Sequence, residues 1–292
     1  MKQFGYTLIE LMIALALGLI IIAAAFQLLI GGQTTLSFQS AINNVQDNAN
    51  IGINYIANDL HHANLDLVSR DMTNSTVSGL IVSSSNYPNN SSDPDDSDYM
   101  IENGLLSQHA TGPSFASIGA NANGSDILVI QYKPVAVNGF DCEGKRIESK
   151  DNIIVQRYFL RLDGASGNLA LACDAGYYHA TEGTKIEDFN DAGQIILQRV
   201  DQFKVLLGVV TGSGQRAYLN LQELNAQPNT TKIVSVQLGI IVRSVDNSGE
   251  NTILPETYNL FGQEYSVTNP AGITGKFLRV PLEQTIAFRN AL

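Results

Sequence analysis

One nearly unbroken apolar stretch, residues 6–30, constrains what this chain can fold into more than any other feature. An α-helix needs about 20 apolar residues to cross the hydrocarbon core of a bilayer. A secretory signal peptide is the main alternative, but its apolar region is short and ends at a small-residue cleavage site. Here the small residues Ala23, Ala24 and Ala25 are followed by further apolar residues. We therefore expect a membrane helix that stays attached to the chain.

Glu10 is the only charged residue between Lys2 and Asp47. A carboxylate in a membrane helix costs about 2.5–3.5 kcal/mol on insertion scales, so an ordinary anchor has no reason to keep one. The residue therefore needs a partner or a purpose. The alternative is a carboxylate that snorkels toward the membrane interface.

The N-terminal sequence MKQFGYTLIELMIALALGLI resembles the N-terminus of type IV prepilins and pseudopilins. That family pattern is a short basic leader ending in Gly, an aromatic residue, a Thr-Leu-Ile-Glu-Leu-like stretch and an apolar helix. Gly5 matches the last leader residue, and Glu10 matches the fifth mature residue. Tyr6 matches the first mature residue, where Phe is commoner.

This resemblance implies a processing step and an assembly device. A prepilin peptidase would cut between Gly5 and Tyr6 and methylate the new amine of Tyr6. Glu10 would then pair with the Tyr6 amine of a neighbouring subunit. Such a pair is strongly attractive in a low dielectric, whereas either charge alone is strongly penalised. Glu10 would therefore set the axial register between helices.

The apolar helix is expected to continue into an amphipathic half. From residue 42 to residue 67, apolar residues recur at spacings of three or four, opposite a face rich in Asn, which is typical of a helix buried on one side. Gly31-Gly32 marks the junction, where a bend or local melting is expected. The expected organisation is a leader at 1–5, a transmembrane and assembly helix at 6–30, an amphipathic continuation at 31–68 and a β-rich periplasmic head at 69–292.

The rest of the chain has the pattern of strands. β-branched and aromatic runs alternate with Gly and Asn turns, most clearly at 233–243, where apolar residues recur with period two. The fold class is therefore α+β, a long N-terminal helix packed on an antiparallel β-sheet head. Strands are expected at 127–132, 153–162, 169–173, 195–200, 203–210, 217–221 and 233–243, with shorter ones near 80–83, 258–261 and 277–280.

The C-terminal segments VDQFKVLLGV, VSVQLGIIVRSVDN and FLRVPLEQTIAFRNAL carry a second resemblance, to the head of PilW-like minor pilins. The shared order is a short strand with Val-Asp or Val-Glu, a long strand ending in Val-Arg-Ser, and a terminal Thr-x-x-x-Arg-Asn. Thr285, Arg289 and Asn290 match that terminal pattern. This second resemblance covers roughly the last ninety residues.

Cys142 and Cys173 are the two cysteines of the chain. A head outside the cytoplasm lies where disulfides persist, so we expect one bridge between them. A bridge across a loop of about 30 residues is worth roughly 3 kcal/mol in the chain-entropy model. Two unpaired buried thiols are the alternative.

The charge of the chain disfavours nucleic acid as a partner. Its formal net charge is −11, and an acidic chain repels nucleic acid phosphates and anionic lipid surfaces. No cofactor and no metal site are expected. His61 and His62 are adjacent and point in different directions on a helix, and the four Asp residues of the loop 93–98 could bind Ca²⁺ but lack the Gly and the closing Glu of an EF-hand.

The expected function is that of an assembly subunit: a minor pilin that helps to initiate a type IV pilus and sits at or near its tip. A pseudopilin of a type II secretion system is the alternative. A membrane-anchored periplasmic enzyme is disfavoured, because no nucleophile elbow or Cys–His pair stands out, and acids such as Glu182, Glu187 and Asp188 are surface acids by default. The resemblance implies location in the bacterial inner membrane, then in the surface pilus. It also implies these partners: prepilin peptidase, other minor pilins, the major pilin, the inner-membrane assembly platform and a tip adhesin.

Overall fold

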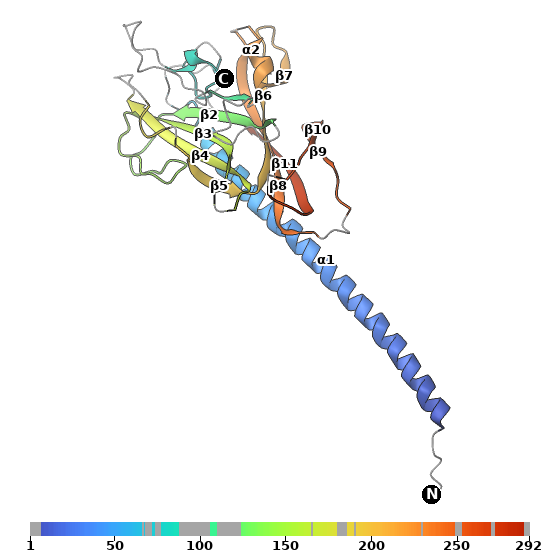
Figure 1. Cartoon of the computed structure of the whole chain (residues 1–292). Coiled ribbons are helices and arrows are strands. Elements are labelled where there is room, and N and C mark those ends of the chain that lie inside the picture. Colours follow the sequence, from blue (N-terminus) through green and yellow to red (C-terminus); the bar gives the residue numbers. More distant parts are fainter. Residues whose placement is uncertain are drawn as a thin grey trace.

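A computed structural model of the chain shows a long helical stalk that enters a β-rich head (Figure 1). The architecture is α+β with antiparallel sheets, as predicted. The structure describes residues 7–65, 67, 72–73, 77–87, 106–109, 124–164, 166–179, 186–189, 191–228, 230–248, 253–269 and 272–288.

The stalk is helix α1, Leu8–His62. It passes through Gly31 and Gly32 as continuous helix, so the expected local melting does not occur. The helix also ends earlier than the predicted end near Leu67. Asn64 adopts a positive φ of 65°, a left-handed conformation that Asn tolerates better than most residues, and its side-chain oxygen accepts a hydrogen bond from the backbone N–H of Gly79 at 2.9 Å.

Two antiparallel sheets form the head. The first sheet has the order β1-β2-β3-β4-β5, and the second has the order β11-β8-β6-β7, while β9 and β10 form a separate hairpin. The strands are β1 Gln108–His109, β2 Asp126–Tyr132, β3 Asn152–Leu162, β4 Leu169–His179, β5 Gln194–Gln198, β6 Val200–Val210, β7 Arg216–Asn220, β8 Lys232–Asn247, β9 Thr257–Leu260, β10 Gln263–Ser266 and β11 Phe277–Ala287.

Several predicted strands differ from the observed elements: β4 continues to His179 rather than ending at Cys173, and the run predicted at 195–200 is divided at Arg199 between β5 and β6. The run expected at 217–221 stops one residue earlier, because Asn220 caps a short helix, α2 Leu221–Asn225. The short strand expected at 80–83 is reduced to one bridge between Leu80 and Ile130, followed by a 3₁₀ turn, Ser84–Asn86. By contrast, the short run expected near 277–280 opens the eleven-residue strand β11.

The core lies between α1 and the two sheets. The predicted apolar face of the helix is the buried one, and Ala49, Ile56 and Leu60 have no exposed surface. These side chains belong to one cluster with inward-facing residues of both sheets, such as Phe203 and Leu238. The stalk is therefore an integral part of the head rather than an attachment to it.

The second sheet turns its other face away from this core, and that face has three zones. Near the stalk, Arg243 and Arg279 lie side by side. In the middle, the β9–β10 hairpin covers the sheet, with the Phe261 ring over Gly239, where an added Cβ would come within 2.8 Å of the ring. Beyond the hairpin, the last residues of β6 and β11, the first residues of β8 and strand β7 form an outward face that includes Tyr218, which is 51% exposed.

Candidate assembly site

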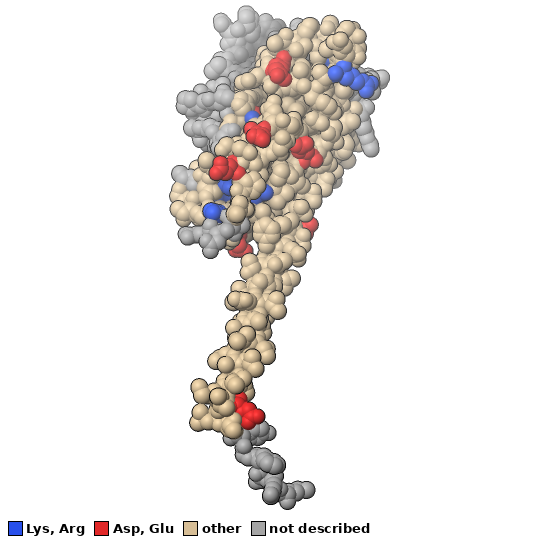
Figure 2. Space-filling view, turned by 90° about the vertical axis from the view of Figure 1, so that its right-hand side faces the viewer, with Lys and Arg blue, Asp and Glu red and all other residues tan. Residues whose placement is uncertain are grey.

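The first half of α1 exposes apolar side chains on all its faces. Its exposed large hydrophobic residues extend from Leu8, which is 77% exposed, to Phe38, which is 40% exposed. The most apolar 18-residue window has a mean hydropathy of 2.7 and no buried residue. On the face seen in Figure 2, the part of the stalk below the head shows no Lys or Arg and has acidic atoms near its lower end. Among the described residues, α1 is the one helix long and apolar enough to cross a membrane.

Glu10 caps the start of this helix. Its carboxylate accepts a hydrogen bond from the backbone N–H of Thr7 at 3.3 Å, and its own N–H donates to the Thr7 hydroxyl at 3.4 Å. This reciprocal arrangement is a capping box, which satisfies two backbone donors at a helix N-terminus. The Thr-x-x-Glu spacing in the sequence is the signal that could have predicted it. Gly5 and Tyr6 lie outside the described residues, so cleavage, methylation and the pairing of Glu10 stay predictions.

A disulfide between Cys142 and Cys173 ties the loop between β2 and β3 to strand β4. The two Cα atoms are 6.1 Å apart, within the usual range for such a bond. The loop is also held to the stalk, because the Tyr55 hydroxyl of α1 donates to the Cys142 carbonyl at 3.2 Å. This bridge thus joins the loop, the first sheet and the helix.

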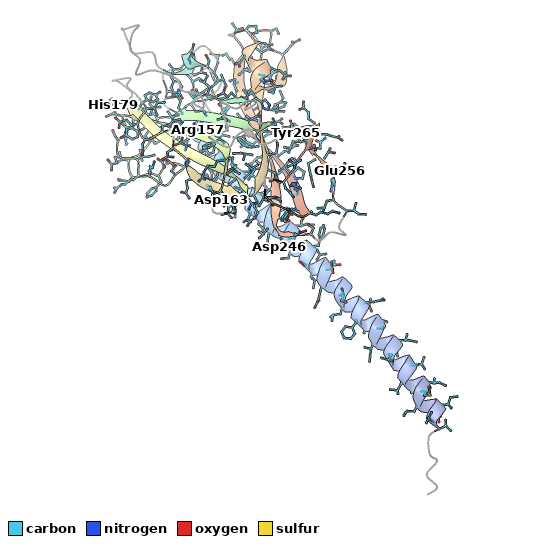
Figure 3. The ribbon with its side chains drawn as sticks, viewed as in Figure 1. Arg157, Asp163, His179, Asp246, Glu256 and Tyr265 are labelled. Atoms are coloured by element: carbon cyan, nitrogen blue, oxygen red, sulfur yellow. A yellow bond between two sulfur atoms is a disulfide. The ribbon has the colours of Figure 1, made fainter. Side chains whose placement is uncertain are left out.

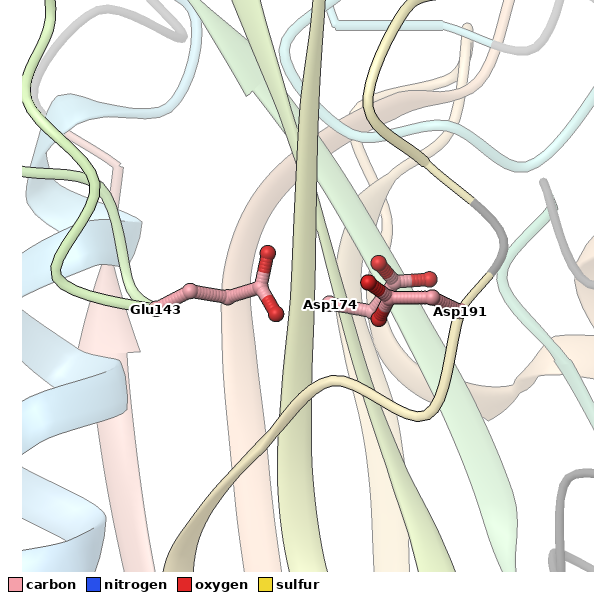
Figure 4. A group of neighbouring side chains, drawn as sticks. All are labelled: Glu143, Asp174 and Asp191. Atoms are coloured by element: carbon pink, nitrogen blue, oxygen red, sulfur yellow. The ribbon is translucent and has the colours of Figure 1, made fainter.

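Three carboxylates gather beside the disulfide, those of Glu143, Asp174 and Asp191 (Figure 4). Each offers an oxygen within 4.8 Å of the others. Two of them already have cationic partners, however: Arg157 Nη2 lies 2.5 Å from Asp174, and Lys145 Nζ lies 2.9 Å from Glu143. The three carboxylates are therefore part of an ion-pair network.

Arg157 of β3, labelled in Figure 3, is buried where it pairs with Asp174. Its guanidinium lies 4.6 Å from the ring centre of Phe159 and 4.9 Å from that of Phe189. Burial lowers the pKa of Arg157 from its ordinary value, although the Asp174 carboxylate opposes this shift. Through its contacts with one carboxylate and two aromatic rings, this buried cation holds together side chains on the outer face of the first sheet.

The Val-Asp and Val-Arg-Ser segments of the PilW-like resemblance meet in the second sheet. Asp201 sits where the register between β6 and β8 shifts, next to the cross-strand pair formed by Arg243 and Arg279. Arg279 Nε donates to Asp201 at 2.6 Å, and Arg243 Nε lies 3.6 Å from its other oxygen. Burial raises the pKa of Asp201, while both arginines oppose the shift. Sequence reasoning identified these segments but not this contact.

The other residues considered from sequence have ordinary surroundings where they are described. Thr285 of β11 accepts a hydrogen bond from Gln237 at 3.0 Å. His62 packs on the Tyr132 ring at 5.7 Å. Glu187 accepts a hydrogen bond from the Tyr177 hydroxyl at 2.8 Å, and Asp188 pairs with Lys145 at 3.0 Å. The loop 93–98, Glu182, Arg289 and Asn290 lie outside the described residues.

Comparison with known families finds two matching segments. Residues 1–26 match the prokaryotic N-terminal methylation motif, and residues 158–290 match the type IV pilus-assembly protein W family, PilW. Both matches confirm the resemblances seen in the sequence.

Comparison with individual proteins adds little to these matches. A type IV-like pilin from Thermus thermophilus, at 11% identity and a TM-score of 0.40, aligns over 84% of this chain and 96% of its own length. Comparison with curated protein sequences finds no significant match.

Proposed function

We propose that this chain, which matches the N-terminal methylation motif over residues 1–26 and the PilW family over residues 158–290, is a minor pilin that helps to initiate type IV pilus assembly and sits at or near the pilus tip. The observation that carries the proposal is a prepilin-type N-terminus on a stalk that exposes apolar side chains all round. Such a surface suits lipid before assembly and the packed helices of a filament afterwards. The large head supports a low-abundance role, because it is bulky for a repeated subunit.

The proposed sequence of events begins at the membrane. The chain lies in the inner membrane through its N-terminal helix, with the head in the periplasm. Prepilin peptidase removes residues 1–5 and methylates the amine of Tyr6. The assembly platform then moves the processed subunit into a complex with other minor pilins, the major pilin and a tip adhesin.

Within that complex, Glu10 is proposed to exchange one partner for another. In the single chain its carboxylate accepts a hydrogen bond from Thr7 at the helix start. In an assembly, the Tyr6 amine of a neighbour offers a full positive charge in a medium of low dielectric. Charge-assisted hydrogen bonds are roughly twice as strong as neutral ones, so the neighbour's amine is the stronger partner. Pairing at one height along each helix then defines the stagger between subunits.

Mass spectrometry of sheared surface filaments tests this function, by searching for the peptide that begins at Tyr6. A methylated Tyr6 peptide at a small fraction of the major pilin is expected. Processed protein confined to the inner membrane, with filaments lacking it, would instead favour a secretion pseudopilin or a transient primer. Wild-type protein that retains residues 1–5 would exclude the prepilin mechanism altogether.

A further inference from the structure

Lys204 and Asp126 form an ion pair between the two sheets of the head. Lys204 lies on β6 of the second sheet, and Asp126 is the first residue of β2 in the first sheet. The Lys204 Nζ atom lies 3.3 Å from Asp126 Oδ1, and the two side chains are 11% and 6% exposed. An amine and a carboxylate are therefore held together at a place that is largely shielded from solvent.

The Asp126 carboxylate is fixed through both of its oxygens. The backbone N–H of Val205 donates to Oδ2 at 2.8 Å, while Oδ1 lies 2.6 Å from Nδ1 of His109, a residue of β1. Gly124, which has a φ of 66°, leaves room for the imidazole, because a Cβ on this residue would come within 3.2 Å of His109 Cε1. One carboxylate oxygen thus faces a backbone donor, and the other faces an imidazole.

The Lys204 amine contacts the same imidazole nitrogen. Its Nζ atom donates to the Gly124 carbonyl, lies 3.2 Å from His109 Nδ1 and lies 5.4 Å from the ring centre of Tyr265, a residue labelled in Figure 3. A group that moves a proton between two atoms must lie within about 2.6–3.2 Å of both. His109 Nδ1 meets this requirement for the amine and for Oδ1. It cannot accept from one and donate to the other at the same time, so it can serve them in turn.

From this geometry we propose that Lys204 and Asp126 become joined by an amide bond between their side chains. His109 Nδ1 takes a proton from the ammonium and gives it to Oδ1, which leaves a neutral amine beside a carboxylic acid. The amine attacks Asp126 Cγ, and the Val205 N–H stabilises the negative charge that develops on Oδ2. A second proton follows the same route, the Cγ–Oδ1 bond breaks, and Oδ1 leaves as water. Two of the three ammonium hydrogens leave in this water and one stays on the amide nitrogen, so no other reactant is needed.

Two physical effects favour this reaction in the folded head. Groups held in contact by a rigid structure react as if each were present at a very high concentration, with effective molarities that reach about 10⁵–10⁸ M in well-oriented cases. Burial also penalises the two separate charges, and replacing a buried ion pair by a neutral group is often neutral or stabilising. The resulting bond joins β2 to β6 and therefore the first sheet to the second. It does not depend on the proposed role in assembly.

Mass spectrometry of the full chain, purified in detergent micelles, tests the proposal. The intact mass is expected to be lower by one water molecule than the mass calculated for the sequence with its disulfide. Trypsin does not cut after an acylated lysine, so cleavage after Lys204 should be lost, and one branched peptide should contain both Lys204 and Asp126. Lys145 is the matched control, because it lies 2.9 Å from Glu143 but is 41% exposed, and trypsin should cut after it.

Two variants assign the roles of the side chains. Lys204→Arg keeps the positive charge but should show no loss of water, because a guanidinium stays protonated in proteins. His109→Gln should slow the loss of water about 100-fold or more, the usual effect of removing a general acid–base, as followed by the mass of pulse-labelled protein over time. A wild-type chain with its full calculated mass and normal trypsin cleavage after Lys204 would overturn the proposal and leave an ion pair only. Loss of water that persists in Lys204→Arg would also overturn it, because the modification would then lie elsewhere.

Discussion

The Asp201 carboxylate lies against Arg279, with a distance of 2.6 Å to Nε, while the neighbouring Arg243 pairs with Arg279 across strands β8 and β11. Like charges directly opposite each other in a sheet are destabilising. The register shift in β6 brings Asp201 to the two guanidinium groups, and its negative charge compensates the repulsion between them. The Arg243 guanidinium also lies 4.7 Å from the ring centre of Phe277.

Arg279→Gln should therefore lower the free energy of unfolding by up to about 3–5 kcal/mol, because it removes the closest cationic partner of the buried Asp201 carboxylate. Urea unfolding followed by near-ultraviolet circular dichroism of the tyrosines measures this change. Asp246→Asn, an exposed acid on the same sheet, should shift stability by no more than about 0.5 kcal/mol. Equal effects of the two substitutions would contradict the role assigned to Asp201.

The disulfide predicts a response to reductant. Replacing both Cys142 and Cys173 by Ser should cost about 3 kcal/mol, because the unfolded chain loses a cross-link. Dithiothreitol should lower the melting temperature of the wild type to that of the double variant and leave the variant unchanged. A wild-type melting temperature that does not respond to reductant would show that the bridge is absent or contributes nothing.

Substitutions of Glu10 separate its two proposed roles. Gln at the same helix position also completes a capping box, so Glu10→Gln keeps the helix start but removes the charge. If the carboxylate pairs with a neighbour's Tyr6 amine, both Glu10→Gln and Glu10→Ala should reduce incorporation into filaments about tenfold or more, since a buried charge loses its partner. Quantitative immunoblots of sheared filaments give the readout. If Glu10→Gln is incorporated normally while Glu10→Ala is not, the role of Glu10 is limited to capping the start of the helix.

Asp59 predicts a pH dependence of stability. This residue of α1 accepts a hydrogen bond from the Tyr158 hydroxyl of β3, and burial raises its pKa above the ordinary 3.8, with nearby Asp141 adding to the shift and His62 and the Tyr158 hydrogen bond opposing it. A raised carboxyl pKa means that the fold favours the protonated form. That contribution is complete below pH 3.8 and is lost as the pH rises through the raised value.

Asp59→Asn resembles the protonated residue at every pH. The variant should therefore be more stable than the wild type at neutral pH, and the difference should shrink as the pH falls through the raised pKa of Asp59 toward 3.8. Thermal unfolding across this range measures the difference. A gap between the two proteins that does not change with pH would show that Asp59 does not titrate as described.

The elements with strong local patterns were predictable from sequence. The helix stripe with Ala49 and Ile56 is buried as expected, and the period-two run of β8 forms the long central strand. Local patterns carry this information because helices and strands expose one face each. The end of α1 was not predictable in the same way, because it depends on a left-handed Asn64 held by Gly79, fifteen residues away.

Contacts between distant segments were not visible in the sequence. Asp201 and Arg279 are 78 residues apart, and their contact depends on a register shift that no local sequence pattern predicts. The N-terminal assembly features were identified through a family pattern rather than from physical reasoning on the residues alone.

The junction between the two sheets has a mechanical consequence. Strands β5 and β6 are separated by Arg199 alone, which has a φ of 57° and whose carbonyl accepts a hydrogen bond from Arg243 at 2.8 Å. One covalent strand therefore runs from the first sheet into the second, while the buried face of α1 packs against both. Under tension applied along the stalk, the helix and both sheets therefore act as one rigid body. A pulled subunit transmits load through its head without first separating the sheets.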